Sequence, residues 1–64
     1  MAIEIGQRYE KIGCYNMIFE VVGFMSTREG LRHARVVLIN DPSDLRTLSE
    51  TVLLDRDLFR LVRN

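Results

Sequence analysis

Apolar residues gather in stretches that predict several short β-strands. Near the N-terminus, residues 3–10 place apolar side chains at period two, which is typical of a half-buried strand. Residues 17–25 and 31–39 are rich in β-branched and aromatic types, which favour strands. Polar residues 26–30 lie between them and end in glycine, a composition that suits the connection of a hairpin. The pattern therefore predicts a first strand followed by a long hairpin.

The second half of the chain permits two interpretations. Residues 41–44, Asp-Pro-Ser-Asp, predict a type I turn, because proline presets φ and the aspartate side chain caps the following amides. A strand over 45–52 then follows, a short helical turn over 53–57 and a last strand over 58–62. The same aspartate and proline also suit the start of a helix. The alternative is therefore an α+β fold, a hairpin sheet packed by a C-terminal helix within 42–62.

The order of the predicted elements resembles that of small SH3-like barrels, most of all the short bacterial barrels of that type. The residues that carry the resemblance are Gly6-Gln7-Arg8-Tyr9 at the first strand and Phe59-Arg60-Leu61-Val62 at the last. The resemblance covers nearly the whole chain and implies a single all-β domain over residues 1–64, a five-stranded SH3-like antiparallel barrel with a short helical turn before the last strand. Related barrels often bind RNA, ribosomal protein or a peptide. The acidic and aromatic motif with which eukaryotic SH3 domains bind polyproline is missing here.

Length and composition narrow the class of protein. A chain of 64 residues lies near the lower limit at which a domain buries enough apolar surface to fold unaided. One cysteine and one histidine exclude a disulfide framework and the usual four-ligand zinc site. The longest apolar run falls well short of the roughly 18 residues that span a bilayer. No secretory signal is recognisable, so we expect a cytoplasmic protein without a membrane partner.

The distribution of apolar residues predicts a surface for association. If both hairpins pair without bulges, both faces of the sheet are apolar, and each face must be shielded from water by something that covers it. One covering is the barrel interior. The other is the C-terminal segment, a glycine-induced bulge that reshuffles the faces, or a second copy of the chain. We expect an outward apolar face that binds a protein partner or forms a homodimer, made of Ile18, Val22, Phe24, Val36 and Leu38.

Positive charge is concentrated at one place in the chain, at Arg28, Arg32, His33 and Arg35. Arginine pairs bidentately with phosphate, so this cluster defines the alternative function, RNA binding by an SH3-like barrel. The same charges also suit a solvent-exposed hairpin whose basic residues pair with glutamates on the neighbouring strands. Nine basic and nine acidic residues cancel, which leaves no net field to attract nucleic acid.

Catalytic and metal chemistry are not expected from the sequence. Cys14 lacks a neighbouring base, and the only histidine, His33, is distant in sequence. The acidic residues do not follow the spacing of a calcium loop and suit turns and caps. The sequence therefore predicts a non-enzymatic binding module without metal or small-molecule cofactor, in which protein binding or self-association is favoured over nucleic-acid binding.

Overall fold

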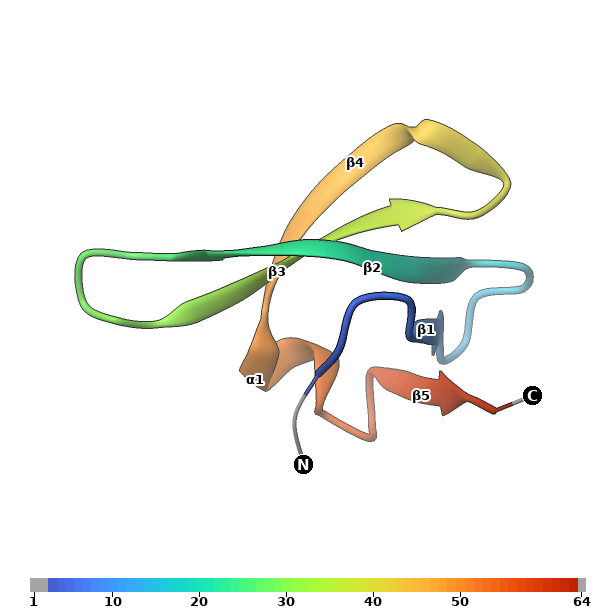
Figure 1. The fold of residues 1–64 in the computed structure, drawn as a ribbon. Helices are drawn as coiled ribbons and strands as arrows, with labels where there is room; N and C mark the ends of the chain where they lie inside the picture. Colours follow the sequence, from blue (N-terminus) through green and yellow to red (C-terminus); the bar gives the residue numbers. More distant parts are fainter. Residues whose placement is uncertain (1–2, 64) are drawn as a thin grey trace.

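The computed structural model describes residues 3–63 as five antiparallel strands and one short helix (Figure 1). The sheet has the order β4-β3-β2-β1-β5, so β1 pairs with both β2 and β5. The prediction of an all-β fold is confirmed. Within residues 3–63 no strand joins β4 to β5, so closure into a barrel stays a prediction. The elements are β1 (Arg8–Lys11), β2 (Ile18–Ser26), β3 (Arg32–Leu38), β4 (Asp41–Ser49), α1 (Glu50–Leu53) and β5 (Phe59–Val62).

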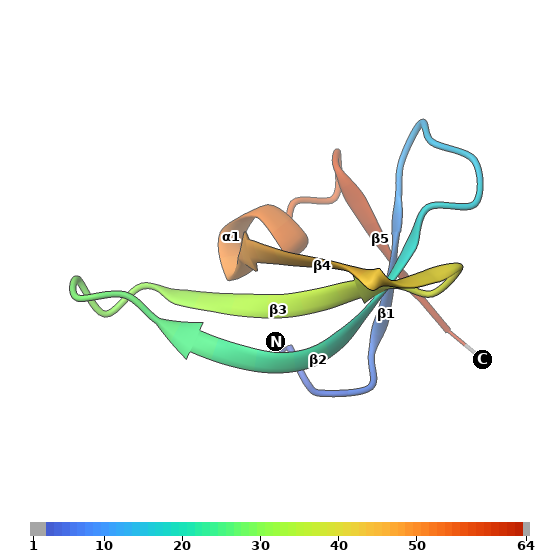
Figure 2. The same cartoon turned by 90° about the horizontal axis from the view of Figure 1, so that it is seen from above.

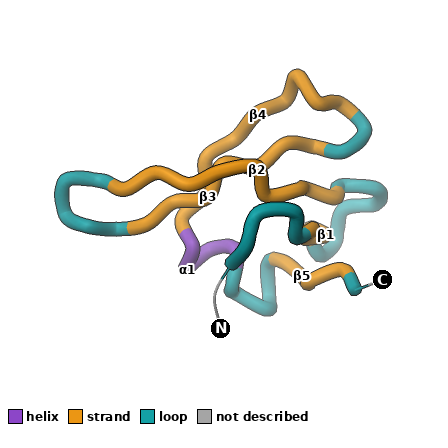
Figure 3. Tube along the Cα trace, in the orientation of Figure 1, coloured by secondary structure: helices purple, strands orange, loops and turns teal. Residues whose placement is uncertain are grey.

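The sheet is strongly bent rather than flat. In Figure 2, β2, β3 and β4 run alongside one another, whereas β1 and β5 run across them. The turn between β2 and β3 projects beyond the rest of the molecule, while α1 lies on the same side as β5 (Figure 3). This bend gives the sheet an inner face, which α1 helps to cover, and an outer face.

The hairpin of β2 and β3 forms where it was predicted, with its connection one residue later. The backbone N–H of Thr27 donates to the carbonyl of Leu31 at 2.9 Å, and the N–H of Gly30 donates to the carbonyl of Thr27 at 3.0 Å. Gly30 has φ +80°, a conformation that favours glycine. The prediction of a hairpin is therefore confirmed, and Gly30 allows the chain to turn there because it adopts a positive φ.

A β-bulge in β2 decides which residues face the core. Val21 pairs with Val36, but the next pair is Gly23 with Arg35, so Val22 is an extra residue. Val21 and Val36 are both 0% exposed, whereas Val22 is 43% exposed. An extra residue in one strand reverses the alternation of faces beyond it. Of the three explanations offered for strands that are apolar on both sides, the structure therefore shows the glycine-induced bulge.

The predicted common outward face is consequently wrong. Val36 is fully buried, and Phe24 and Leu38 pack against the core, because the bulge aligns them with the inner face. Ile18 and Val22 lie outside this core. The bulge-free pairing on which the prediction depended placed all five on one side, namely Ile18, Val22, Phe24, Val36 and Leu38.

The second hairpin turns earlier than predicted. Leu38 already pairs with Asp41, so the chain reverses at residues 39 and 40 instead of at 41–44. The next pair is Val37 with Leu45, which leaves residues 42–44 looped out of the ladder. Proline has no N–H for a ladder and is tolerated at bulges of edge strands such as β4. The Asp-Pro-Ser-Asp segment is therefore a bulge within β4.

Side chains satisfy the polar groups of this bulge. The carboxylate of Asp41 accepts the backbone N–H of Ser43 at 3.3 Å. Asp44 accepts two hydrogen bonds from the guanidinium of Arg46, at 3.0 and 3.1 Å. These bonds to Arg46 hold the pKa of Asp44 below its ordinary value. The acidic residues of this segment thus make local polar contacts, but they do so in a bulge and not in the predicted turn.

The C-terminal part follows the strand interpretation with one shift. β4 extends to Ser49, whose hydroxyl accepts the N–H of Val52 at 3.2 Å and caps α1. The helix begins at Glu50, three residues before the predicted helical turn, and has four residues. The alternative of a long C-terminal helix is therefore wrong. Capping by Ser49 ends the strand and sends Leu53, which is 1% exposed, into the core.

The buried core draws on α1 and on every strand except β4, whose Leu48 is partly buried and packs against it. Phe19 and Phe59, from β2 and β5, meet edge to face with ring centroids 6.2 Å apart. Burying a large apolar side chain contributes roughly 1.5–3 kcal/mol, so these few residues dominate the stability of so small a chain. The buried core residues are Ile3, Tyr9, Phe19, Val21, Ala34, Val36, Leu53 and Phe59.

Candidate functional site

The predicted basic cluster does not form one patch. Arg32 lies on the inner side of β3, with its guanidinium carbon 3.8 Å from the ring centroid of Phe24. It also pairs with Glu50 of α1, with 3.5 Å between Nε and Oε2. Arg32 is thus engaged within the protein, where it covers an aromatic ring and ties the hairpin to the helix.

The other members of the cluster lie elsewhere. His33 and Arg35 are the neighbouring outward positions of β3, since Ala34 between them is 0% exposed. The ring of His33 is 3.4 Å from the carbonyl of Leu31. Arg28 lies in the turn between β2 and β3. The prediction of a single cluster is wrong, because successive residues of a strand point to opposite faces.

Cys14 and His33 lie at opposite ends of the central hairpin. Cys14 precedes the start of β2, and His33 pairs with Met25 near its end. The intervening strand spans roughly 20 Å at about 3.3 Å per residue. Within residues 3–63 no group of three metal-ligating side chains occurs. The thiol and imidazole therefore cannot act as a nucleophile and its base in this fold.

The outer face of the sheet carries an apolar group with revised membership. Val37 pairs with Leu45 across the β3–β4 ladder, and the N–H of Ile39 donates to the carbonyl of Ile18 at 2.9 Å. Val22 and Leu45 are 43% and 47% exposed, and the others are half-buried. We call these residues the outer apolar group: Ile18, Val22, Val37, Ile39 and Leu45.

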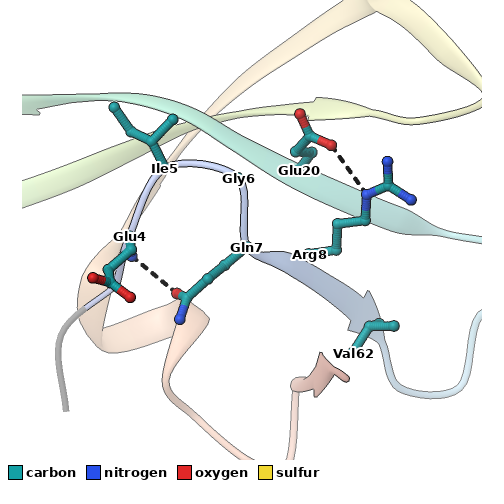
Figure 4. Close-up of a pocket in the computed structure, with 7 residues that line it drawn as sticks. All are labelled: Glu4, Ile5, Gly6, Gln7, Arg8, Glu20 and Val62. Carbon is teal, nitrogen blue, oxygen red and sulfur yellow. Dashed lines mark hydrogen bonds and ion pairs between the residues drawn. The ribbon is translucent and has the colours of Figure 1, made fainter. Parts of the chain in front are cut away.

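A polar hollow lies between the N-terminal turn and β2 (Figure 4). We call it the Glu4–Glu20 hollow, and its volume is about 610 Å³. The N–H of Glu4 donates to Oε1 of Gln7 at 2.9 Å, and Nε of Arg8 donates to Glu20 at 3.0 Å. The side chains of Gln7, Arg8 and Glu20 are therefore already paired within the protein, while the carboxylate of Glu4 has no partner within residues 3–63.

An apolar pocket lies on the other side of β1, beside α1 and β5. We call it the α1–β5 pocket, and its volume is about 370 Å³. Its floor is formed by the core residues Tyr9, Leu53 and Phe59, which reach the lining although each is less than 10% exposed. Ile12 and Leu54 stand at its rim and are 48% and 42% exposed. Core side chains thus border the α1–β5 pocket from below.

Arginine side chains supply the charge of the α1–β5 pocket. Arg56, Arg60 and Arg63 line it, together with Gln7 and Leu61. Arg60 is neutralised by an ion pair with Glu10 of β1. Among the residues that the structure describes, the lining includes no carboxylate. The pocket therefore combines an apolar floor with a positively charged border.

Tyr9 presents the one buried hydroxyl at the pocket floor within residues 3–63. Its O–H donates to Oε1 of Gln7 at 3.1 Å. Burial raises the pKa of Tyr9, and the nearby charge of Glu50 raises it further. The phenol is therefore a neutral hydrogen-bond donor at physiological pH, and Gln7 fixes its direction.

No family model, curated protein or solved structure matches the chain. No helix in the described part of the chain is long and apolar enough to cross a membrane. Sequence reasoning missed the α1–β5 pocket, because its lining comes from positions between 7 and 63 that only the paired β1 and β5 bring together.

Proposed function

We propose that the protein is a non-enzymatic binding module that docks a segment of a partner protein in the α1–β5 pocket. The observation that carries this proposal is an apolar pocket whose floor is formed by core side chains and whose rim carries the exposed Ile12 and Leu54. Binding sites are typically concave and apolar, with a few polar groups that fix orientation. The arginines and the amide of Gln7 supply such groups here.

The size of the pocket suits one or two side chains of a partner. A volume of about 370 Å³ lies at the lower end of the range for ligand sites, about 300–1,000 Å³. A buried apolar anchor in a pocket of this kind supplies much of the affinity in many protein interfaces. The proposal therefore predicts recognition of a short segment instead of a broad, flat contact.

Selection from a random peptide library displayed on phage tests the proposal. Recovered clones are compared on the wild type, on Leu54→Asp at the pocket rim and on Ile5→Asp, a matched control at a side chain that is 66% exposed. We expect clones that lose binding to Leu54→Asp and keep binding to Ile5→Asp. Circular dichroism verifies that both variants fold. Peptides that bind Leu54→Asp as well as they bind the wild type, or a selection that yields no specific peptides, would contradict the proposal.

A second candidate function, self-association, is favoured by the outer apolar group. Two of its members, Val22 and Leu45, are more than 40% exposed, and contiguous exposed apolar residues often mark association. Two ion pairs, Arg8 with Glu20 and Arg60 with Glu10, stand beside them on this face. We propose a second copy of the chain as the occupant, because a neutral protein has no net repulsion between copies.

Sedimentation velocity over a concentration series tests self-association. The wild type is expected to form dimers, and Leu45→Asp is expected to weaken them because it places a charge in the contact. Leu31→Asp is the control, since Leu31 is 62% exposed and lies in the turn outside the outer apolar group. A wild type that remains monomeric throughout, or equal dimerisation of Leu45→Asp, would contradict this candidate.

A further inference from the structure

The charged side chains that line the α1–β5 pocket are all arginines. Neither Arg56 nor Arg63 has a carboxylate within 4.0 Å of its guanidinium in the described part of the chain. Asp55 and Asp57 flank Arg56 in sequence, but the carboxylate of Asp55 accepts the backbone N–H of Asp57 at 2.9 Å. Two available positive charges therefore border an apolar floor on a chain whose net charge is zero.

The edge of the sheet beside this pocket is open. β5 ends the sheet, and within residues 3–63 no strand pairs with its outer side. The N–H of Ile12 donates to the carbonyl of Leu58 at 2.9 Å, which fixes the alternation along the β1–β5 ladder. By that alternation, the backbone groups of Phe59 and Leu61 point away from β1. The N–H of Phe59 donates to Asp55 at 2.9 Å, so Leu61 presents the N–H at this edge.

These features fit one recognition mode in which an extended chain adds to an exposed strand edge. Backbone hydrogen bonds hold such a chain, and alternate side chains enter pockets beside the edge. Leu61 lines the α1–β5 pocket with its side chain, so the open edge and the apolar floor are adjacent. A carboxylate near an unpaired guanidinium forms charge-assisted hydrogen bonds, which are stronger than neutral ones.

We infer that the partner segment is an extended acidic stretch of a protein chain. It adds to the outer edge of β5 at Leu61, seats one apolar side chain on the pocket floor and brings carboxylates to Arg56 and Arg63. This inference rests on the proposed function, because it names the chemistry of the segment that the pocket takes.

Fluorescence anisotropy with two blocked peptides tests the inference. The acidic probe is Glu-Asp-Leu-Val-Asp-Glu, and the matched probe replaces every acidic residue with lysine. We expect saturable binding of the acidic probe and at least about tenfold weaker binding of the lysine probe, a difference of about 1.4 kcal/mol. Arg63→Glu is expected to weaken the acidic probe about tenfold and to improve the lysine probe, whereas Arg8→Glu, outside the pocket, changes neither.

A second readout concerns the strand edge. Amide hydrogen exchange at Leu61 is expected to slow when the acidic probe is bound, because the added strand accepts this N–H. Equal binding of both probes, unchanged exchange at Leu61 or binding of neither probe would overturn the inference. If the library selection yields peptides that need Leu54 but contain no acidic residues, the proposed function stands and the inference fails. If the amide NMR signals of the pocket residues shift when the concentration of the protein alone is raised, a second copy occupies the pocket, and the inference fails as well.

Discussion

The Glu4–Glu20 hollow and the α1–β5 pocket lie on either side of Gln7, whose side chain lines both. The hollow is larger, about 610 against about 370 Å³, but the side chains of Gln7, Arg8 and Glu20 in its lining are already paired. The pocket is smaller, has the core as its floor and has two arginines without a carboxylate partner within residues 3–63. The volume of a pocket is therefore a poor guide to a binding site, and side chains without a partner in the protein are a better one.

The largest expected difference between the two regions concerns stability. Phe59→Ala should lower the free energy of unfolding by about 3–5 kcal/mol, because it removes a core ring that also packs on Phe19. Ile5→Ala, in the hollow, should change it by less than about 0.5 kcal/mol, since Ile5 is 66% exposed. Chemical denaturation followed by circular dichroism measures both. Equal losses would mean that the pocket floor is not part of the core.

Gln7 joins the two regions, so its replacement should affect both. Gln7→Leu removes the acceptor for the hydroxyl of Tyr9 and for the N–H of Glu4. Leaving a buried hydroxyl without a partner costs about 1–3 kcal/mol. Gln7→Glu keeps an acceptor and is the matched control. Denaturation curves in which the two variants coincide with the wild type would show that this bridge contributes nothing.

The ion pair of the hollow should contribute less. Arg8→Ala removes the pair with Glu20, whose side chains are 50% and 33% exposed. Exposed pairs contribute about 0–1 kcal/mol, and salt screens them. We expect a loss below about 1 kcal/mol that vanishes at high salt. A larger loss that persists at high salt would indicate a structural role for the hollow that its exposure does not suggest.

The smallest effect is expected at alkaline pH. The pKa of Tyr9 is raised in the folded protein, so its contribution to stability is complete below about pH 10, the unfolded value, and is lost as the pH rises through the folded value. Tyr9→Phe should therefore flatten the fall of stability above pH 10. Denaturation at several alkaline pH values measures this slope. An identical slope in wild type and variant would contradict the burial of this hydroxyl.

Local chemistry predicted the central hairpin, because glycine and polar residues at the turn and β-branched residues in the strands act over short distances. The faces of that hairpin were not predictable in the same way. One extra residue, Val22, reverses which residues of β2 face the core and which face outward. The only sign of this in the sequence is the following Gly23. The outward assignment of Val36 failed for this reason, although its apolar character was informative.

The site was harder to predict than the fold. The α1–β5 pocket depends on the position of α1, which begins at the cap residue Ser49, and on the pairing of β1 with β5 across most of the chain. Arg56 and Arg63 stand in no motif, and only the fold places both at one apolar floor. The cluster that the sequence did show, at Arg32 and Arg35, is divided between two faces of β3.

The most direct test maps the binding surface by NMR. ¹⁵N-labelled protein is titrated with the acidic peptide probe, and amide shift changes are assigned along the chain. We predict that the largest changes occur at Ile12, Leu54 and Leu61 around the α1–β5 pocket, with Gly6 and Arg8 in the hollow unchanged. Changes confined to Gly6 and Arg8, or no saturable change anywhere, would contradict it.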